Sequence, residues 1–394
     1  MLTLNYQYRI YPGAEQEATM LSWLETLRQS YNYALREVKD WSASRRCGID
    51  RCELSRCYVM PADAPFPSEH IQQANLVEAK KRFPELKQVQ SQVLQQNIKR
   101  LHKAFEGMRK QGRGYPRFKK YGRMRSFLFP QFRDNPIVGY QLKLPKLGLM
   151  PIVLHRPIPD GFVVKQVRVV AKARGTQWFV NVSIQSAADV PEHSPMGRSV
   201  GIDLGIEKFL TTSDGEQVLF PRFFRRLQAE LRSLQRRAAR KVRRSMNWEK
   251  AQVRVARLHA HIANVRRLFH WRTAHWLCDR ADVIFYEDLN IKGLARGFLA
   301  KDCLDASWGG FVEVLKQVCW KRGKTCFAVD PRGTSQICPM CKGHTPKKLS
   351  DRWHKCQDPA CGFEADRDHA SAIEIDDRGN ALITARGLRV VETA

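Results

Sequence analysis

Several acidic side chains in the C-terminal half of the chain follow or interrupt apolar segments. Asp203 follows Val-Gly-Ile, Glu287 follows Val-Ile-Phe-Tyr, and the pair Asp366 and Asp368 lies in Ala-Asp-Arg-Asp-His-Ala-Ser-Ala. An acid that ends a buried strand is unfavourable unless a metal ion or another cation compensates its charge. Several such acids from different strands can converge to hold divalent metal ions for phosphodiester cleavage. The pattern therefore predicts a metal-dependent enzyme that cuts nucleic acid.

Four cysteines just before the last acidic pair have the spacing of zinc ligands. The two pairs are Cys338 with Cys341, and Cys356 with Cys361. Two cysteine pairs about fifteen residues apart are a strong signal for tetrahedral zinc. Because the protein fills all four positions, we expect one structural zinc ion rather than a catalytic one. His344 and His354 lie nearby, so the sequence also allows a mixed set of cysteine and histidine ligands.

The remaining cysteines give weaker signals. The chain has 11 cysteines, an odd number that argues against a disulfide framework. Cys47, Cys52 and Cys57 are evenly spaced in a basic segment and allow a second metal site, although ordinary packing is the favoured interpretation. No apolar run reaches the roughly 18–20 residues of a membrane span, and the first residues lack a signal-peptide pattern. We therefore expect a cytoplasmic protein without a membrane partner.

The charge of the chain is its most unusual bulk property. Lys and Arg number 67 against 39 Asp and Glu, which gives a formal net charge of +28. An excess of this size predicts a polyanionic partner, with nucleic acid first among the candidates.

Two segments concentrate this charge and are the expected nucleic-acid contacts. In the first, aromatic rings that can stack on bases alternate with cations that can meet phosphates. In the second, cations crowd one end of a predicted helix. The alternatives are a basic loop whose aromatics fill a core, and a solvated helix face. The first set is Tyr115, Arg117, Phe118, Lys119 and Lys120, and the second is Arg236, Arg237, Arg240, Lys241, Arg243 and Arg244.

The first half of the chain has the pattern of strands and helices in one domain. Hydrophobic residues make up 43% of the sequence, enough for real cores, and 394 residues predict two or three domains. Alternation predicts strands at 2–10, 163–170 and 178–184, which could form a small antiparallel barrel interrupted by helices. Helical spacing covers 14–39 and 71–110, and 41–70 has an irregular pattern. A polar linker at 191–195 predicts the main boundary between domains.

The second half alternates strand and helix. The pattern predicts strands at 199–205, 281–289 and 325–329, long basic helices within 222–280, and a helix at 308–323. Alternation of this kind favours an α/β domain with a mixed sheet.

Five motifs occur together in an order that identifies a family. They are Gly-Ile-Asp-Leu-Gly at 201–205, Tyr-Glu-Asp-Leu-Asn-Ile at 286–291, Asp-Ala-Ser-Trp-Gly-Gly-Phe at 305–311, Thr-Ser-Gln-Ile-Cys-Pro-Met-Cys at 334–341, and Cys-Gly-Phe-Glu-Ala-Asp-Arg-Asp-His-Ala-Ser-Ala at 361–372. This set resembles TnpB, the insertion-sequence-encoded RNA-guided nucleases related to type V CRISPR effectors. The resemblance is close over residues 199–375 and looser in the N-terminal half, where Tyr-Pro-Arg-Phe-Lys-Lys at 115–120 carries it.

The resemblance implies a multidomain fold of α/β and β parts. It implies a wedge-type β-barrel with an inserted helical recognition lobe, then a RuvC-like nuclease domain of RNase H fold with an inserted zinc module. The implied limits are 1–12 and 111–190 for the barrel, 13–110 for the lobe, 197–330 and 363–380 for the nuclease domain, 331–362 for the zinc module and 381–394 for a C-terminal tail.

The resemblance also implies an activity and its partners. It implies Mg²⁺-dependent cleavage of target DNA that is paired to a transposon-derived guide RNA, beside a short adjacent motif, by a monomer or a dimer on RNA in a prokaryotic cytoplasm. By motif position, Asp203, Glu287 and Asp368 are the acids expected to hold the catalytic Mg²⁺, two ions being the expected number. Two alternatives stay open: a compact type V CRISPR effector, and a guided DNA-binding repressor that does not cut.

The last motif departs from the family pattern. The family usually has Asp-x-Asn-Ala-Ala, whereas this chain has Asp368-His-Ala-Ser-Ala, with Ala370 in place of the asparagine. This departure leaves the choice between Asp366 and Asp368 open, and Asp368 is preferred because it keeps the spacing to the small residues that follow.

Overall fold

The computed structural model describes the chain except for residues 47–60, 62, 191, 298, 349–350 and 387–394. The described residues form two compact units, Met1–Val190 and Pro191–Ala394. The division lies at the start of the linker that the sequence predicts. Each unit is described by itself.

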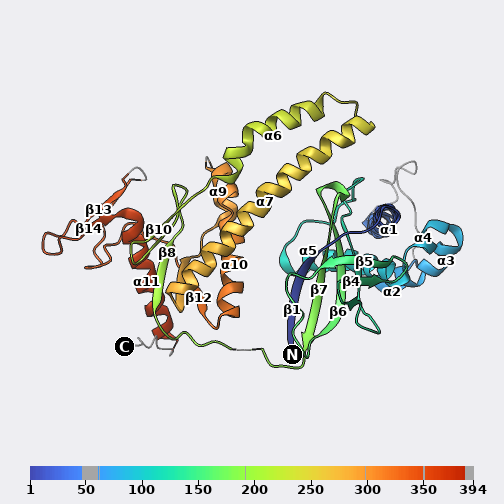
Figure 1. The fold of residues 1–394 in the computed structure, drawn as a ribbon. Helices are drawn as coiled ribbons and strands as arrows, with labels where there is room; N and C mark the ends of the chain where they lie inside the picture. Colours follow the sequence, from blue (N-terminus) through green and yellow to red (C-terminus); the bar gives the residue numbers. More distant parts are fainter. Residues whose placement is uncertain (47–60, 62, 191, 298, 349–350, 387–394) are drawn as a thin grey trace. The chain divides into compact units, whose positions relative to one another are not determined.

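The first unit is an antiparallel sheet with helices packed on it (Figure 1). Its strands lie in the order β2-β6-β7-β1-β5-β4-β3, so the N-terminal strand β1 is in the middle of the sheet. In chain order its elements are β1 (Leu2–Ile10), α1 (Ala14–Arg46), α2 (Glu69–Ala74), α3 (Leu76–Arg82), α4 (Pro84–Gln88), α5 (Ser91–Gln111), β2 (Ser126–Phe129), β3 (Ile137–Val138), β4 (Gln141–Leu144), β5 (Gly148–Val153), β6 (Val163–Lys172), a 3₁₀ turn (Ala173–Gly175) and β7 (Gln177–Ser186).

Alternation along the strands separates the core of this unit from the opposite face of the sheet. Tyr8, Ile10, Val180 and Val182 are buried and share one face, as expected for a strand with a period of two. Helices α1 and α5 cover this face, and Trp23 of α1 is fully buried in the same core. The strands predicted at 2–10, 163–170 and 178–184 are confirmed, and they pair with one another as β1, β7 and β6.

Two predicted element limits in this unit are wrong. The first helix runs to Arg46 rather than ending at 39, so residues 41–46 are helical and not irregular. The predicted helix 71–110 is divided into four. The break between α3 and α4 follows from Pro84, whose ring disfavours a helical conformation at the preceding residue, so Phe83 is extended. The last of these helices, α5, ends at Gly112, whose φ of 61° is a left-handed value that glycine adopts easily.

The second unit contains a five-stranded mixed sheet in the order β10-β9-β8-β11-β12. Strands β8, β11 and β12 are parallel neighbours, and β9 and β10 are antiparallel, which confirms the predicted mixed sheet. In chain order the elements are β8 (Ser199–Asp203), β9 (Lys208–Thr212), β10 (Gln217–Leu219), α6 (Phe223–Ala239), α7 (Met246–Arg280), β11 (Val283–Glu287), α8 (Ile291–Leu294), α9 (Ala300–Ala306), α10 (Trp308–Lys321), β12 (Thr325–Val329), β13 (Trp353–Lys355), β14 (Glu364–Asp366) and α11 (Arg367–Ala385).

Helices cover both faces of this sheet (Figure 1). On one face, α7 and α10 pack through a large apolar core that includes Leu277, Phe311 and Leu315. On the other face, α11 packs through a smaller core of Phe285, Ile375 and their neighbours. The parallel strands are therefore buried on both sides, which explains the near-continuous apolar runs that precede Asp203 and Glu287 in the sequence.

Helices α6 and α7 pair as a long hairpin whose base is anchored by two buried acids of α9. Asp305 accepts hydrogen bonds from the backbone N–H of Phe224 and from Arg266. Asp302 forms a two-pronged ion pair with Arg225, with both N–O distances at 2.7 Å. These contacts fix the start of α6 against α9. Among the described residues, no helix is both long and apolar enough to cross a membrane.

Candidate active site and metal centre

The three preferred acids lie at the ends of elements that meet at one edge of the five-stranded sheet. Strands β8 and β11 are parallel and in register, with Ile202 opposite Tyr286. Asp203 follows the first of these residues and Glu287 follows the second, so both acids lie at the carboxyl ends of neighbouring strands. Asp368 lies in the first turn of α11, the helix that covers this sheet.

Two glycines allow α11 to lie close against these strands. A Cβ atom added at Gly201 would be 2.2 Å from the backbone oxygen of Ala372 in α11, a distance no real atom pair allows. A Cβ atom added at Gly379 of α11 would be 2.1 Å from the ring of Phe285 in β11. Gly201 lies two residues before Asp203, and Phe285 lies two residues before Glu287. The close packing at these two points therefore sets the position of α11 relative to both acids.

The electrostatics of Asp203 show that the three acids interact. Burial raises the pKa of Asp203 well above its ordinary value, and the negative charges of Glu287 and Asp368 raise this pKa further. Arg367 and the backbone N–H of Leu204 act in the opposite direction but do not offset these effects. A divalent cation bound beside these carboxylates would stabilise the charged form of Asp203.

Glu287 has a specific hydrogen-bond partner in the segment before the cysteines. The hydroxyl of Thr334 donates to Glu287 Oε1 at 2.5 Å. Burial raises the pKa of Glu287, whereas this hydrogen bond and the charge of Arg378 lower it. The Glu287 carboxylate is therefore partly desolvated, and the hydrogen bond from Thr334 fixes one of its two oxygens.

Asp366 and Asp368 have different surroundings. Asp366 caps α11 by accepting from the backbone N–H of Asp368, and it forms an ion pair with Lys208 at 2.8 Å. Lys208 lowers the pKa of Asp366, against the effect of burial. Asp368 instead contributes to the negative potential at Asp203. Asp366 is thus paired with Lys208, whereas Asp368, which lies 3.4 Å from Arg367, is the member of the pair whose charge acts on Asp203.

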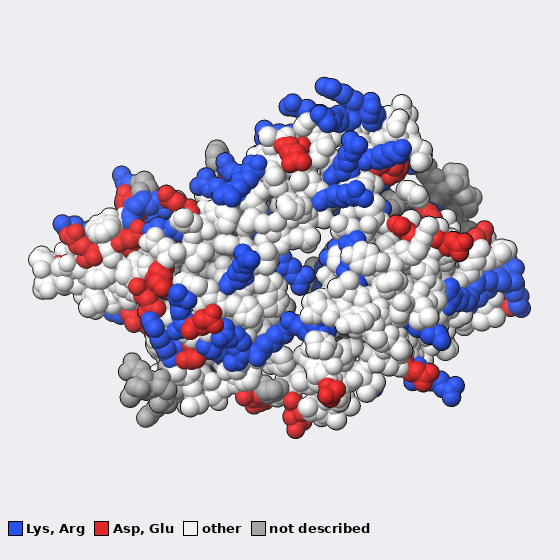
Figure 2. Space-filling view, in the orientation of Figure 1, with Lys and Arg blue, Asp and Glu red and all other residues white. Residues whose placement is uncertain are grey.

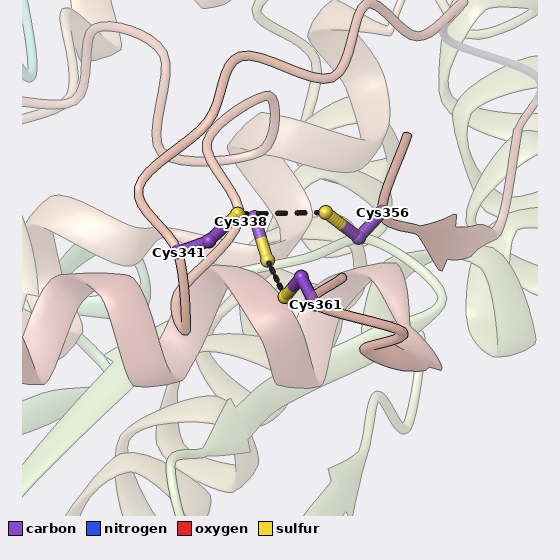
Figure 3. A group of neighbouring side chains, drawn as sticks. All are labelled: Cys338, Cys341, Cys356 and Cys361. Carbon is purple, nitrogen blue, oxygen red and sulfur yellow. Dashed lines mark hydrogen bonds between the residues drawn. The ribbon is translucent and has the colours of Figure 1, made fainter. Parts of the chain in front are cut away.

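The four cysteines of the sequence pattern form a compact group (Figure 3). Their sulfur atoms all lie within 4.8 Å of one another. Cys338 Sγ lies 3.7 Å from Cys361 Sγ, and Cys341 Sγ lies 3.5 Å from Cys356 Sγ. Four sulfurs at about 2.3 Å from a tetrahedral zinc ion would be about 3.8 Å apart, so the group fits a metal such as zinc.

The histidines that could have joined this group have other partners. His344 Nε2 lies 3.2 Å from Gln336 Oε1, and His354 is fully buried, where its Nδ1 contacts Lys347. Within the described part of the chain, the four cysteines are the only set of three or more Cys, His, Asp or Glu side chains whose ligand atoms meet this closely. The three acids do not meet as closely as the thiols. In a two-metal site the ions lie about 4 Å apart, so three acids need not all contact one ion.

The two basic segments lie in different surroundings. Tyr115 and Phe118 are 44% and 43% exposed, and the ammonium group of Lys39 lies over both rings. Asn32 of α1 hydrogen-bonds both the N–H and the C=O of Lys119, which fixes this segment on the first unit. Arg117 and Lys120 are exposed beside these rings.

The second segment covers the end of α6 and the turn that leads to α7. Its six cations are all exposed, and Figure 2 shows Lys and Arg side chains gathered over this end of the helical hairpin. The second metal site that the sequence allows at Cys47, Cys52 and Cys57 lies outside the described residues.

Several residues that shape the site were not predicted from the sequence. Thr334 belongs to a motif that identifies the family, but its spacing gives no indication that it contacts Glu287. Lys208 and Gly201 lie in or beside strands, and only the packing of α11 brings them to the acids. These roles depend on contacts between segments far apart in the chain.

The chain matches known families and proteins along most of its length. Residues 179–297 match a family described as "Probable transposase" (OrfB_IS605), and residues 308–375 match "Cas12f1-like, TNB domain". Residues 1–47 match a family described as "Helix-turn-helix domain", although residues 1–46 fold here as strand β1 and the single helix α1.

Two curated relatives cover almost the whole chain. "Putative RNA-guided DNA endonuclease InsQ" of Escherichia coli (strain K12) is 30% identical over 96% of this chain and 92% of its own. A "Putative RNA-guided DNA endonuclease" of Streptomyces pristinaespiralis is 30% identical over 94% of this chain and 88% of its own. A cryo-EM structure of a Cas12f1-sgRNA-target DNA complex is 14% identical with a TM-score of 0.34, over 96% of this chain and 100% of that chain. The identity to InsQ over nearly the full length of both chains shows that this chain belongs to the TnpB family.

Proposed function

We propose that this chain is an RNA-guided DNA endonuclease of a transposable element. The observation that carries the proposal is the interaction of Asp203, Glu287 and Asp368 at one edge of the sheet, where burial and mutual repulsion raise the pKa of Asp203. Membership in the TnpB family and the names of the two relatives support the same function. The enzyme cleaves target DNA that is paired to a guide RNA and flanked by a short motif.

In this proposal the units correspond to the parts that the family implies. The strand order β10-β9-β8-β11-β12, with three parallel and two antiparallel strands, supports a RuvC-like domain of RNase H fold within 197–330 and 363–380. The antiparallel sheet of the first unit supports a wedge-type barrel formed by 1–12 and 111–190, with 13–110 as the inserted recognition lobe. Residues 331–362 are the zinc module.

Asp203, Glu287 and Asp368 would hold Mg²⁺, and their donor set fits this ion because all three supply carboxylate oxygens. When bound, Mg²⁺ lowers the pKa of an attacking water and stabilises the negative charge that develops on the phosphate. The three acids are half-buried, which lowers the hydration of their charges, and Thr334 holds one oxygen of Glu287. Arg367 lies next to Asp368 at 3.4 Å and limits the repulsion among the acids.

The four cysteines would hold one structural Zn²⁺. Sulfur–sulfur distances of 3.5 and 3.7 Å fit the spacing of a tetrahedral thiolate site. No position would be left for water, so the ion would stabilise the loops rather than take part in cleavage.

The exposed basic segments would contact the backbone of guide RNA and target DNA. Replacing Arg236, Arg240 and Arg243 by Gln should reduce the slope of log K against log salt by about 0.7–0.9 for each phosphate that these side chains neutralise. The control removes three exposed cations that are each paired with an acid: Lys81, Lys110 and Lys355. An unchanged slope in the arginine variant would mean that this helix end is only a solvated face.

Cleavage of a plasmid library with randomised flanks tests the proposal as a whole. Protein purified with its native RNA should deplete one flank motif beside the sequence that matches the guide, because base pairing supplies the specificity. Nicking that needs neither RNA nor complementary DNA would identify an unguided nuclease instead. Guided binding without cleavage in Mg²⁺ would identify the repressor, an alternative favoured by the buried Ala370 at the family's asparagine position. The RNA that copurifies would distinguish a transposon end from a CRISPR array.

A further inference from the structure

One hydroxyl connects the segment before the cysteines to an acid of the proposed active site. Thr334 is only 4% exposed, and its hydroxyl oxygen lies 2.5 Å from Glu287 Oε1 and 3.2 Å from the backbone oxygen of Pro331. A hydroxyl has one proton to donate, and a carboxylate is a stronger acceptor than a neutral carbonyl. The shorter contact is therefore the dominant hydrogen bond.

The segment that carries Thr334 is fixed to α11 on its N-terminal side. The guanidinium of Arg378 in α11 donates to the backbone oxygens of Asp330 and Arg332, at 2.9 and 2.8 Å. The same side chain forms an ion pair with the buried Glu374 at 2.8 Å, so its position is set. The residues just before Thr334 are therefore held by α11, the same helix that bears Asp368 in its first turn.

The same segment is fixed on its C-terminal side by the first cysteine pair. The backbone N–H of Ile337 donates to the oxygen of Gly333, which forms a single helical turn around Thr334 that leads directly into Cys338. After the pair, Lys342 binds Glu374 and Asp377 of α11 at 2.9 and 2.6 Å. Glu374 therefore binds both Arg378 and Lys342, the side chains that hold the segment on its two sides. Thr334 and the first cysteine pair are thus both attached to α11.

A glutamate side chain has three rotatable bonds, so its carboxylate is not oriented by the strand that bears it. We propose that Thr334 is a positioning residue that orients the Glu287 carboxylate for metal binding, and that the four-cysteine loop holds Thr334 in place. The inference rests on the proposed function, since it requires Glu287 to bind metal. Partners of metal-binding carboxylates act in this way at other sites, and their loss lowers metal affinity or activity by about 10–100-fold.

Matched substitutions of Thr334 test this role in the full-length protein loaded with its guide RNA. Thr334→Val keeps the shape and removes the hydroxyl, whereas Thr334→Ser keeps the hydroxyl. Thr334→Val should raise the Mg²⁺ concentration that gives half-maximal cleavage by about 10-fold, and Thr334→Ser should restore most of the difference. Thr345→Val is the control, because Thr345 is also 4% exposed in the same loop region and, within the described residues, has no hydrogen bond to any of the three acids.

A second measurement does not depend on cleavage. Mn²⁺ binding to the nucleic-acid-free full chain, followed by electron paramagnetic resonance, should weaken by a similar factor in Thr334→Val and not in Thr345→Val. Zinc content and melting temperature should match the unmodified protein in both variants. An unchanged Mg²⁺ requirement and unchanged Mn²⁺ binding in Thr334→Val would overturn the proposal.

Two other outcomes separate this inference from its premise. If Thr334→Val and Thr334→Ala both lose zinc or unfold while Thr334→Ser does not, Thr334 serves the fold and the inference is wrong. If Glu287→Gln cleaves as well as the unmodified protein, the proposed active site itself is wrong. Loss of cleavage in Glu287→Gln with normal Mg²⁺ dependence in Thr334→Val would overturn only the role of Thr334.

Discussion

The two candidate metal centres of the second unit are assembled in opposite ways. The four cysteines lie between residues 338 and 361, and their sulfurs are already at distances that suit a tetrahedral metal. The acids come from distant parts of the chain, and Asp203 and Asp368 are 165 positions apart. The acids do not meet as closely as the thiols, and the charges of Glu287 and Asp368 raise the pKa of Asp203.

Ligand chemistry and chain distance together explain this difference. Neutral thiols can approach one another without a metal, whereas carboxylates at neutral pH repel unless a cation lies between them. The cysteine loop needs only two short turns and the hairpin of β13 and β14. The acids need the register of β8 with β11 and the close packing of α11, so the whole unit must fold before they meet.

The largest expected effect is on cleavage, and it tests whether the acids form one centre. Asp203→Ala or Glu287→Ala should reduce DNA cleavage at least about 100-fold while guide RNA binding is retained, because each change removes a metal ligand. Asp288→Ala, at the exposed acid next to Glu287, is the control and should cleave normally. Full cleavage by either ligand variant would show that these acids do not form the active site.

A smaller effect is expected from the cysteine centre, because it supports the site without belonging to it. Chelator-washed protein should retain about one zinc ion per chain at about 2.3 Å from each sulfur, measured by elemental analysis and X-ray absorption. Cys341→Ser should lose this zinc and reduce cleavage by about 10-fold at low Mg²⁺, through the segment that holds Thr334. Zinc-free protein in which Cys338 and Cys341 are freely alkylated would contradict the assignment.

The same contrast explains what the sequence could predict. The cysteine set was predictable because its ligands are close in the chain, and the sulfur–sulfur distances fit the predicted metal. The acids could be proposed because each ends an apolar run, but their convergence depends on strand register. The preference for Asp368 over Asp366 is supported by the shorter ion pair of Asp366 with Lys208 and by the effect of Asp368 on Asp203. Lys208 is 158 positions away from Asp366 in the chain.

The fold shows the same limit. Strands β1, β6 and β7 were predicted from alternation, and their pairing follows from the shared apolar face. The break between α4 and α5 was missed because the apolar spacing of Leu86, Val89 and Val93 continues across the extended Val89. Contacts such as Gly201 against Ala372 and Gly379 against Phe285 cannot be read from spacing, because each joins residues of different elements.

Removal of one repelling charge should stabilise the metal-free protein. Asp203→Asn keeps the size of the side chain and removes a buried charge that Glu287 and Asp368 disfavour. In chelator-treated buffer without Mg²⁺, we expect a rise in melting temperature of about 2–4 °C for each kcal/mol gained by a unit of this size. Asp160→Asn, at an exposed acid of the first unit, should leave the melting temperature unchanged. A lower melting temperature for Asp203→Asn would show that its charge is compensated within the protein.

The smallest expected effect is a pH dependence that only the acid centre should have. The folded-state pKa of Asp203 is raised, so the unfolded chain loses this proton first as pH rises from about 4. The free energy of unfolding should therefore fall as pH rises toward the folded-state pKa, and the raised pKa of Glu287 acts in the same direction.

Mg²⁺ binds the charged acids and should restore the free energy of unfolding that is lost in this way. The rise in melting temperature that Mg²⁺ produces in the nucleic-acid-free protein should thus be larger at about pH 8 than at about pH 5.5. Asp203→Asn should reduce this difference, whereas Cys341→Ser should keep it, because the cysteine centre does not supply the titrating groups. An equal Mg²⁺ effect at both pH values would mean that the acids are already charged at the lower pH, and their repulsion would then be too weak to distinguish the two centres.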